Sequence, residues 1–236
     1  MKSLNKSFAS CLLLIICLCI SGCGDFHIRD RVAGALSKKY VVDNYYVDDV
    51  LVEGVVRRVL FVPCKDISGY QSEDFLSEID SVFLKQLRRS KKFDIVPYEQ
   101  VLNEEQKKFI DSMDIERKGS YDADTLYEIG RKVNVQGILF GSISEYNPKK
   151  PILLGVKINL IHIRRGTIVW AVDEIFDAAR DDIKNLARAY YYENYDTSLN
   201  PSLKWEFILN SMKDFSNFYF YEMIKTFSPK APLPQQ

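Results

Sequence analysis

The sequence predicts an α/β (α+β) domain in which a mixed β-sheet of about five strands is covered by helices. Three observations carry this prediction. Residues 136–174 read as three successive strands with short connections, which is typical of an antiparallel meander. Residues 55–98 alternate strand, helix and strand, which favours a right-handed crossover and a parallel half of the sheet. Residues after 180 show helical spacing of aromatic side chains, so we expect C-terminal helices that cover the sheet.

The parallel half begins with an apolar strand over Val55–Pro63, which the proline ends. Ser72 is a suitable N-cap for the helix that follows, because apolar residues then recur at helical spacing as far as Leu87. Phe93–Tyr98 is the second strand. Two further helices are expected before the meander, one over Glu99–Ile110 and one capped by Asp122 or Asp124.

The meander is the most regular stretch of the chain. Gly137–Tyr146 opens as a continuous apolar run, as in a strand that is covered on both faces. Arg164–Gly166 is a short hairpin connection in which the glycine is free to take a positive φ. In the last strand, alternation places Ile168, Trp170 and Val172 on one face.

Composition sets few limits on function. The chain has 236 residues, of which 47% are hydrophobic and 27% charged, and its formal net charge is 0. This is ordinary globular composition. A neutral balance gives no general attraction to nucleic acid, so no nucleic-acid partner is expected.

The start of the chain is a secretory signal. Met1–Lys6 contains two lysines and is followed by the apolar run Phe8–Ile20, which is shorter than the roughly 20 residues of a membrane-spanning helix. Ile20, Ser21, Gly22 and Cys23 together resemble a bacterial lipobox, in which the cysteine receives lipid and becomes the first residue of the mature protein. The resemblance implies removal of residues 1–22 and a palmitate-bearing membrane anchor at Cys23. Residues 23–54 are expected to form a tether that becomes an edge strand or arm near Tyr45–Val52.

The residue after the cysteine bears on the destination. By analogy with sorting in enteric bacteria, Gly24 favours the periplasmic face of the outer membrane. Asp25, one place later, weakens this assignment, so the inner membrane is the alternative location.

The sequence shows little catalytic chemistry. Phosphate-binding loops, H-E-x-x-H and G-x-G-x-x-G are all missing. His27 has no partner at ligand spacing, and His162 is expected to be a satisfied core or edge residue of a strand. Once the signal is removed and Cys23 is lipidated, Cys64 is the remaining thiol, which rules out an intramolecular disulfide. We therefore expect no enzyme, no cofactor and no metal. An envelope hydrolase with an unrecognised site around His162 is the competing hypothesis.

The C-terminal part is expected to be helical. Helices are predicted over Asp181–Tyr195, over Ser202–Leu209, and from an N-cap at Ser211 to about Phe227. The predicted organisation is a mixed α/β domain over 55–178, a helical extension packed on it over 179–228, and a disordered tail over 229–236.

Aromatic residues of this part are the candidate partner surface. Tyr192, Phe220 and Tyr221 fall outside the apolar faces of the predicted helices, and Trp205 lies in the short helix between them. Exposed aromatic rings are enriched at binding hot spots. The alternative is that these helices bury their aromatic residues against the sheet.

Four short segments resemble a known group of proteins. They are Arg58–Pro63, Ser90–Pro97, Ile129–Ser144 and Arg165–Trp170. Together they resemble the periplasmic domain of curli-secretion (CsgG-type) and penicillin-binding-protein activator (LpoB-type) lipoproteins over about Val55–Glu174. The resemblance implies a non-enzymatic binding, assembly or regulatory module of the cell envelope with an envelope protein as partner.

The chain also departs from that pattern. Cys64 follows the proline where the family typically has phenylalanine. A pore needs extra membrane-spanning hairpins with strands of about 9–11 residues, and the connections 147–151 and 164–166 are too short to hold them. An oligomeric component of an outer-membrane export apparatus is therefore the alternative function, and self-association stays open.

Overall fold

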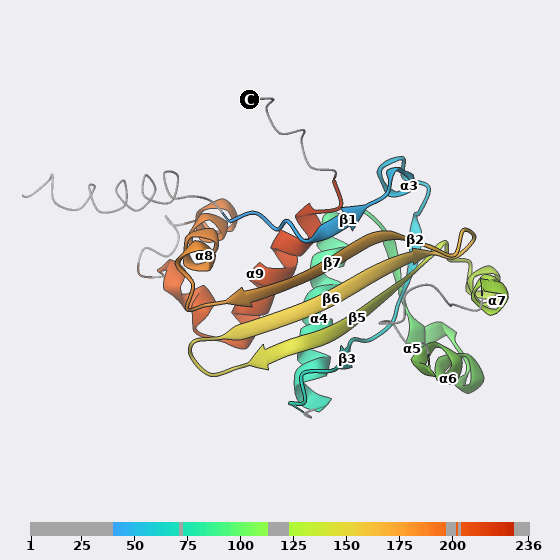
Figure 1. The fold of residues 1–236 in the computed structure, drawn as a ribbon, viewed down its shortest axis with the longest axis horizontal. Coiled ribbons are helices and arrows are strands. Elements are labelled where there is room, and N and C mark those ends of the chain that lie inside the picture. The colour runs from blue at the N-terminus through green and yellow to red at the C-terminus, as the bar shows by residue number, and fades with distance from the viewer. Residues whose placement is uncertain (1–39, 71–72, 113–122, 197–201, 203, 229–236) are drawn as a thin grey trace, which may run out of the picture.

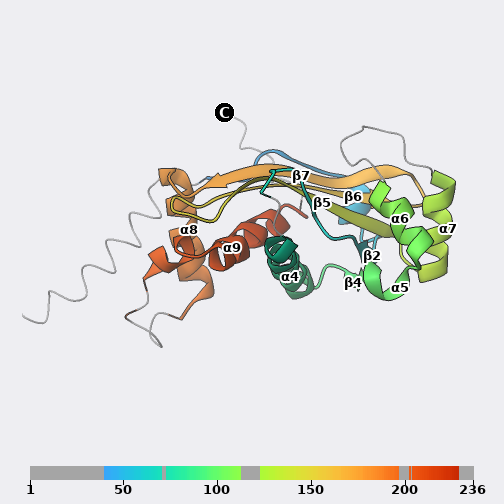
Figure 2. The ribbon, with the colours of Figure 1, turned by 90° about the horizontal axis from the view of Figure 1, so that it is seen from below.

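The computed structural model describes residues 40–70, 73–112, 123–196, 202 and 204–228. They form a seven-stranded sheet with helices packed on it (Figures 1 and 2). The strands are β1 (Tyr45–Val47), β2 (Arg58–Phe61), β3 (Lys65–Asp66), β4 (Asp94–Pro97), β5 (Gly137–Asn147), β6 (Leu153–His162) and β7 (Thr167–Asp177). Their order is β1-β7-β6-β5-β2-β4, and β3 pairs with β5.

The expected mixed architecture is confirmed. β2 pairs in parallel with both β4 and β5, whereas β5, β6 and β7 form the antiparallel meander. The hairpin between β6 and β7 contains Gly166 at φ 64, as the sequence indicates. β1 is the edge strand expected near Tyr45–Val52, and the short strand β3 was not expected.

The helices are α3 (Asp49–Val52), α4 (Glu73–Ser90), α5 (Tyr98–Val101), α6 (Glu104–Ser112), α7 (Ala123–Val133), α8 (Asp181–Asn194), the 3-10 helix η1 (Trp205–Leu209) and α9 (Met212–Lys225). α4, α8 and α9 cover one face of the sheet, and Figure 2 shows them together below it. α5, α6 and α7 pack on the opposite face at one end (Figure 1). Each face therefore has its own hydrophobic core.

β2 shows how the sequence supplies both cores. Val59 and Phe61 point to the face of α4 and α9, while Leu60 and Val62 point to the face of α5–α7. A strand with both faces buried needs an unbroken apolar run, and VLFV is such a run.

The predicted face of the last strand is wrong at Ile168. A register shift between β6 and β7 separates the pairs Leu160–Trp170 and Ile161–Ile168. Val169 and Trp170 therefore both reach the core under α9, and Ile168 packs against the opposite core. A β-bulge adds one residue to a strand and reverses the alternation beyond it, which strict period-2 patterning does not anticipate.

The helix expected over Glu99–Ile110 is two helices. α5 ends at Val101, and α6 begins after Asn103 with a reciprocal cap. The N–H of Gln106 donates to Asn103 Oδ1 at 2.9 Å, and the N–H of Asn103 donates to Gln106 Oε1 at 3.1 Å. This capping box ends one helix and starts the next.

α9 is fixed to the sheet by polar as well as apolar contacts. Its N-cap is Ser211, as predicted, whose Oγ accepts from the N–H of Asp214. The buried Tyr219 hydroxyl accepts from the N–H of Val156 at 3.1 Å and donates to the carbonyl of Glu174 at 2.7 Å. Trp170 Nε1 donates to Thr226 Oγ1 at 2.8 Å.

Candidate binding groove

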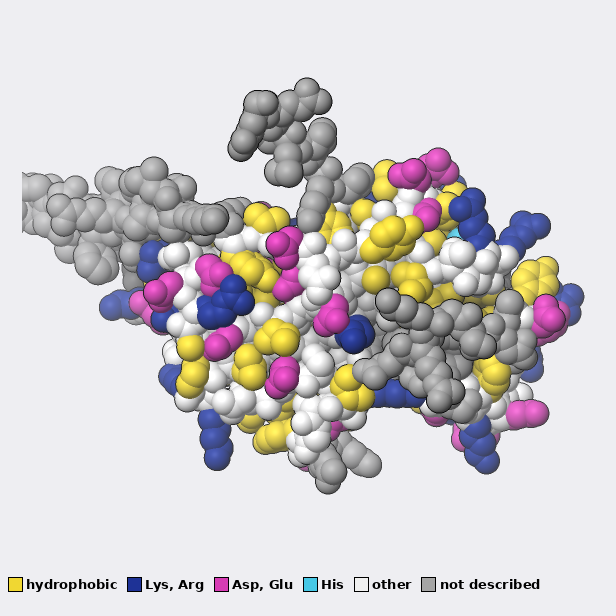
Figure 3. Space-filling view, viewed as in Figure 1, with side chains coloured by type: hydrophobic (Ala, Val, Ile, Leu, Met, Phe, Trp, Pro, Cys, Tyr) yellow, Lys and Arg dark blue, Asp and Glu magenta, His cyan; other side chains and the backbone are white. Residues whose placement is uncertain are grey.

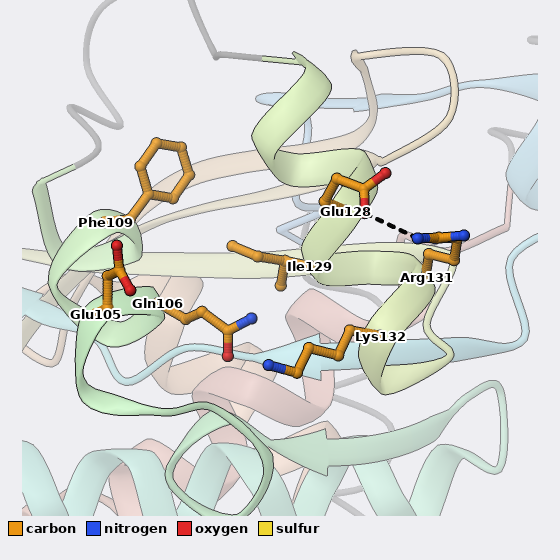
Figure 4. A pocket seen from close by; sticks show the side chains of 7 residues that line it. All are labelled: Glu105, Gln106, Phe109, Glu128, Ile129, Arg131 and Lys132. Atoms are coloured by element: carbon orange, nitrogen blue, oxygen red, sulfur yellow. Dashed lines mark hydrogen bonds and ion pairs between the residues drawn. The ribbon is translucent and has the colours of Figure 1, made fainter.

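A groove lies between α6 and α7, with a volume of about 640 Å³ (Figure 4). Its lining residues are Glu105, Gln106, Phe109, Glu128, Ile129, Arg131 and Lys132. Figure 4 shows Glu105, Gln106 and Phe109 coming from α6, and the other four from α7. A concave site with apolar and charged lining is the usual form of a binding site.

The two walls are held in place by the core beneath them. Ile110 of α6 and Leu126 of α7 are fully buried in the same hydrophobic core as Ile138 of β5. α7 lies very close to the end of β6, because a Cβ atom added at Gly130 would be 2.7 Å from Ile163 Cδ1. The outward side chains of both helices are therefore presented above one shared hydrophobic core.

The lining combines apolar area with both signs of charge. Phe109 and Ile129 supply the apolar part, and Lys132 points across the groove toward Gln106 (Figure 4). Arg131 Nη2 pairs with Glu128 Oε2 at 3.1 Å. Gln106 is oriented by its cap contact with Asn103. The lining offers hydrogen-bond donors, acceptors and an apolar surface, and none of its seven side chains is a serine, cysteine or histidine.

Sequence reasoning did not identify this groove. Two features of the sequence bear on its walls: the apolar spacing in α7, and the capping-box spacing of Asn103 and Gln106, which the sequence analysis missed. The groove itself depends on how two separate helices pack on one face of the sheet.

The predicted exposure of Phe220 is wrong. Its side chain is fully buried, and its ring stacks on Phe83 of α4 with centroids 4.4 Å apart. Trp205 is also buried, at 8% exposure, with the guanidinium of Arg188 over its ring. α9 lies between α4, η1 and the sheet, so aromatic residues on several of its sides become core residues.

Tyr192 and Tyr221 are half-buried at the rim of the same core. The Tyr221 ring contacts Tyr190 at 4.9 Å, and Lys225 Nζ lies 4.3 Å from its centre. The Tyr192 ring lies edge-on to Tyr191. A partner surface formed by these two residues stays a prediction.

Asp80 of α4 and Cys64 are two buried ionisable groups that contact each other. The N–H of Cys64 donates to Asp80 Oδ1 at 3.0 Å. Burial raises the pKa of Asp80 to about 6 despite this hydrogen bond, and burial beside that carboxylate raises the pKa of the Cys64 thiol. Cys64 also packs tightly against the sheet, because a Cβ atom added at Gly141 would be 2.4 Å from its sulfur. Cys64 is therefore the buried thiol that the sequence indicates.

The surroundings of His162 are those of a buried, hydrogen-bonded structural residue. It is buried at the end of β6, and its Nδ1 accepts from the N–H of Arg165 at 3.1 Å. Burial and the neighbouring Arg165 lower its pKa. In the part of the chain that the structure describes, no three His, Cys, Asp or Glu residues gather in a way that could hold a metal ion.

The predicted anchor lies outside the described residues. This applies to Ile20, Ser21, Gly22 and Cys23, to the tether as far as residue 39, and to the tail over 229–236. Within the described ranges, no helix combines the length and the apolar character that crossing a membrane requires.

No protein-family model and no curated protein matches the chain. Similar solved structures include the PelC dodecamer from Paraburkholderia phytofirmans (16% identity, TM-score 0.34, 57% of this chain and 81% of that chain). They also include lipoprotein GNA1162 from Neisseria meningitidis (14%, 0.33, 51% and 79%) and the LpoB C-terminal domain from Escherichia coli (15%, 0.37, 55% and 93%). At these identities and TM-scores, the likenesses support no conclusion about family or function. The expected resemblances to LpoB-type and to curli-secretion lipoproteins stay predictions.

Proposed function

We propose that the chain is a lipid-anchored lipoprotein of the bacterial cell envelope that acts in the periplasm as a non-enzymatic binding module. The observation that carries the binding role is the α6–α7 groove, because it is concave and lined by apolar and charged groups. Recognition of an envelope protein partner at this groove, with an assembly or regulatory outcome, is the proposed activity. The outer membrane is the proposed location, on the basis of Gly24 after the lipobox.

The anchor has a direct test. The lipobox proposal expects Cys23→Ala to abolish labelling by radioactive palmitate and to release the protein from membranes. Two or more acyl chains are needed for stable anchoring, so loss of the cysteine removes the attachment as a whole. Retained label in the variant would refute the proposal.

The groove has a separate test in intact envelopes. A photo-crosslinking amino acid at Arg131, whose side chain is 70% exposed on the groove wall, should give a discrete adduct on irradiation. The matched control is the same group at Lys149, an exposed residue of the β5–β6 connection. Lys132→Glu should weaken the adduct at position 131, because it reverses one charge of the lining. Identical adducts from positions 131 and 149, or none from 131, would contradict a partner at the groove.

A further inference from the structure

Residues 40–55 form an arm along the β7 edge of the sheet. Tyr45–Val47 pairs antiparallel with Trp170–Val172 of β7. On either side of this pairing, the N–H of Asp173 donates to the carbonyl of Asn44, and the N–H of Asp48 donates to the carbonyl of Val169. The arm is therefore part of the folded domain.

Glu174 of β7 fixes the start of the arm. Its Oε2 accepts from the Tyr40 hydroxyl at 2.5 Å, and its Oε1 accepts from the N–H groups of Asp43 at 3.2 Å and Asn44 at 3.1 Å. The Tyr40 ring packs edge-on against Phe176. The tether thus enters the domain at one defined point on this edge.

The arm exposes four large apolar side chains among its exposed polar residues. Val41 is 62% exposed, Tyr46 51%, Val52 44% and Val55 47%. They are half of the large hydrophobic side chains that stand out as exposed in the described ranges; the others are Ile67, Tyr70, Tyr127 and Ile175. Figure 3 shows hydrophobic side chains gathered along the edge that carries β1 and α3. We call Val41, Tyr46, Val52 and Val55 the apolar arm face. Exposed apolar groups that gather along one edge of a domain mark a candidate interaction surface.

The length of the tether indicates what this face meets. Only residues 24–39 separate Cys23 from Tyr40. Even fully extended, such a segment spans no more than about 60 Å. The membrane is therefore always within reach of the edge from which the tether starts, and a short tether raises the effective concentration of a tethered surface to about the millimolar range.

The charges of the arm specify the kind of lipid surface. Residues 40–55 contain Asp43, Asp48, Asp49 and Glu53 and no lysine or arginine. Arg165 lies near Asp48, and the Arg180 guanidinium lies over the Tyr40 ring, so two cations face four carboxylates. Anionic lipid would repel the remaining excess of negative charge. Tyrosine and apolar side chains are suited to the boundary between headgroups and acyl chains. A zwitterionic surface fits this combination.

We propose that the apolar arm face rests on the zwitterionic lipid surface that holds the anchor; this inference rests on the proposed lipidation of Cys23. The domain then lies with its β1 edge on the membrane. β4 is at the opposite edge of the sheet, so α5, which follows it, lies on the side away from the lipid (Figure 1).

The test compares two labelled positions in the lipidated full chain. Bimane is attached to Val52→Cys or, as a control of matched exposure on α7, to Tyr127→Cys, which is 47% exposed. Native Cys64 is buried and does not compete for the label. In phosphatidylethanolamine–phosphatidylcholine vesicles with nitroxide-headgroup lipid, we expect quenching at position 52 to exceed that at position 127 by about twofold or more, as for a face that enters the headgroup boundary.

Two further changes test the physical cause. Val41→Ser combined with Val55→Ser should reduce quenching at position 52 to the level at 127, with an unchanged circular dichroism spectrum. Adding phosphatidylglycerol should also reduce it. Equal quenching at positions 52 and 127 in protein that floats with the vesicles would overturn the inference and leave the anchor intact. If bimane fluorescence at position 52 instead changes with the amount of protein per vesicle and not with nitroxide lipid, the face contacts a second copy of the chain. That result would equally overturn the inference.

Failure of the lipid anchor can be distinguished from failure of the proposed contact between the arm and the membrane. Protein that does not float with vesicles refutes lipidation of Cys23. The arm is then tested in a Cys23→Ser form held on nickel-chelating lipid by a histidine tag placed at the same position, and the comparison of positions 52 and 127 decides as before.

Discussion

Replacing Phe220 by alanine tests directly how the C-terminal helices pack. The Phe220 ring is fully buried and stacks on Phe83 with an interplanar angle of 16°, and it also meets the Tyr219 ring edge-on. Truncating such a ring removes its apolar burial and leaves a cavity, which together cost about 3–5 kcal/mol. For a domain of this size the corresponding fall in Tm is about 10 °C.

The assay is urea and thermal unfolding of the soluble form with Cys23→Ser, followed by circular dichroism. Tyr221→Ala is the matched control, because the adjacent ring is only half-buried and should cost about 1–2 kcal/mol. Phe220→Leu, which keeps most of the volume, should cost less than Phe220→Ala. A Phe220→Ala variant that loses no more stability than Tyr221→Ala would refute the packing of α9 against α4.

Three further predictions concern the sheet and the helix beneath it. Asp80 has a pKa of about 6 in the fold against 3.8 when exposed. The free energy of unfolding should therefore fall by up to about 3 kcal/mol as pH rises from 4 to 7. Urea titrations at each pH measure this fall, and Asp80→Asn should remove it. Gly141→Ala should lower the free energy of unfolding by about 1–3 kcal/mol, because the new Cβ meets the Cys64 sulfur. Adding Cys64→Ala should recover part of this stability, and strictly additive losses in the double variant would refute the clash. Tyr219→Phe should cost about 1–2 kcal/mol in the same unfolding assay, since its hydroxyl bonds to both β6 and β7; an unchanged midpoint would contradict this.

Local signals predicted the elements well where the physics is local. Gly166 takes the positive φ that a tight hairpin requires, and Ser211 caps α9 as its spacing to Asp214 indicates. The apolar run of β2 predicts burial on both faces, which the two hydrophobic cores confirm. These features depend on residues close together in the chain, so the sequence contains all that is needed.

The two wrong predictions about β7 and about the helix before the meander each have a definite physical cause. The bulge at Val169 changes the face of Ile168, and the capping box at Asn103 divides one expected helix into two. The bulge depends on how β7 pairs with β6, so alternation within a single strand does not reveal it. The capping box was present in the sequence, and periodicity alone concealed it.

By itself the sequence determined the order of the five strands β2, β4, β5, β6 and β7, the parallel and antiparallel halves of the sheet, and the burial of Cys64. Only the tertiary structure decided which aromatic residues become core. Phe220 and Tyr221 are neighbours in the chain, yet α4 covers one and leaves the other at the rim. The groove between α6 and α7 and the fixed arm at Glu174 likewise join residues far apart in sequence. The burial of a particular aromatic ring and the concave shape of the groove both arise from the packing of separate elements. They can therefore be identified only when those elements are placed together.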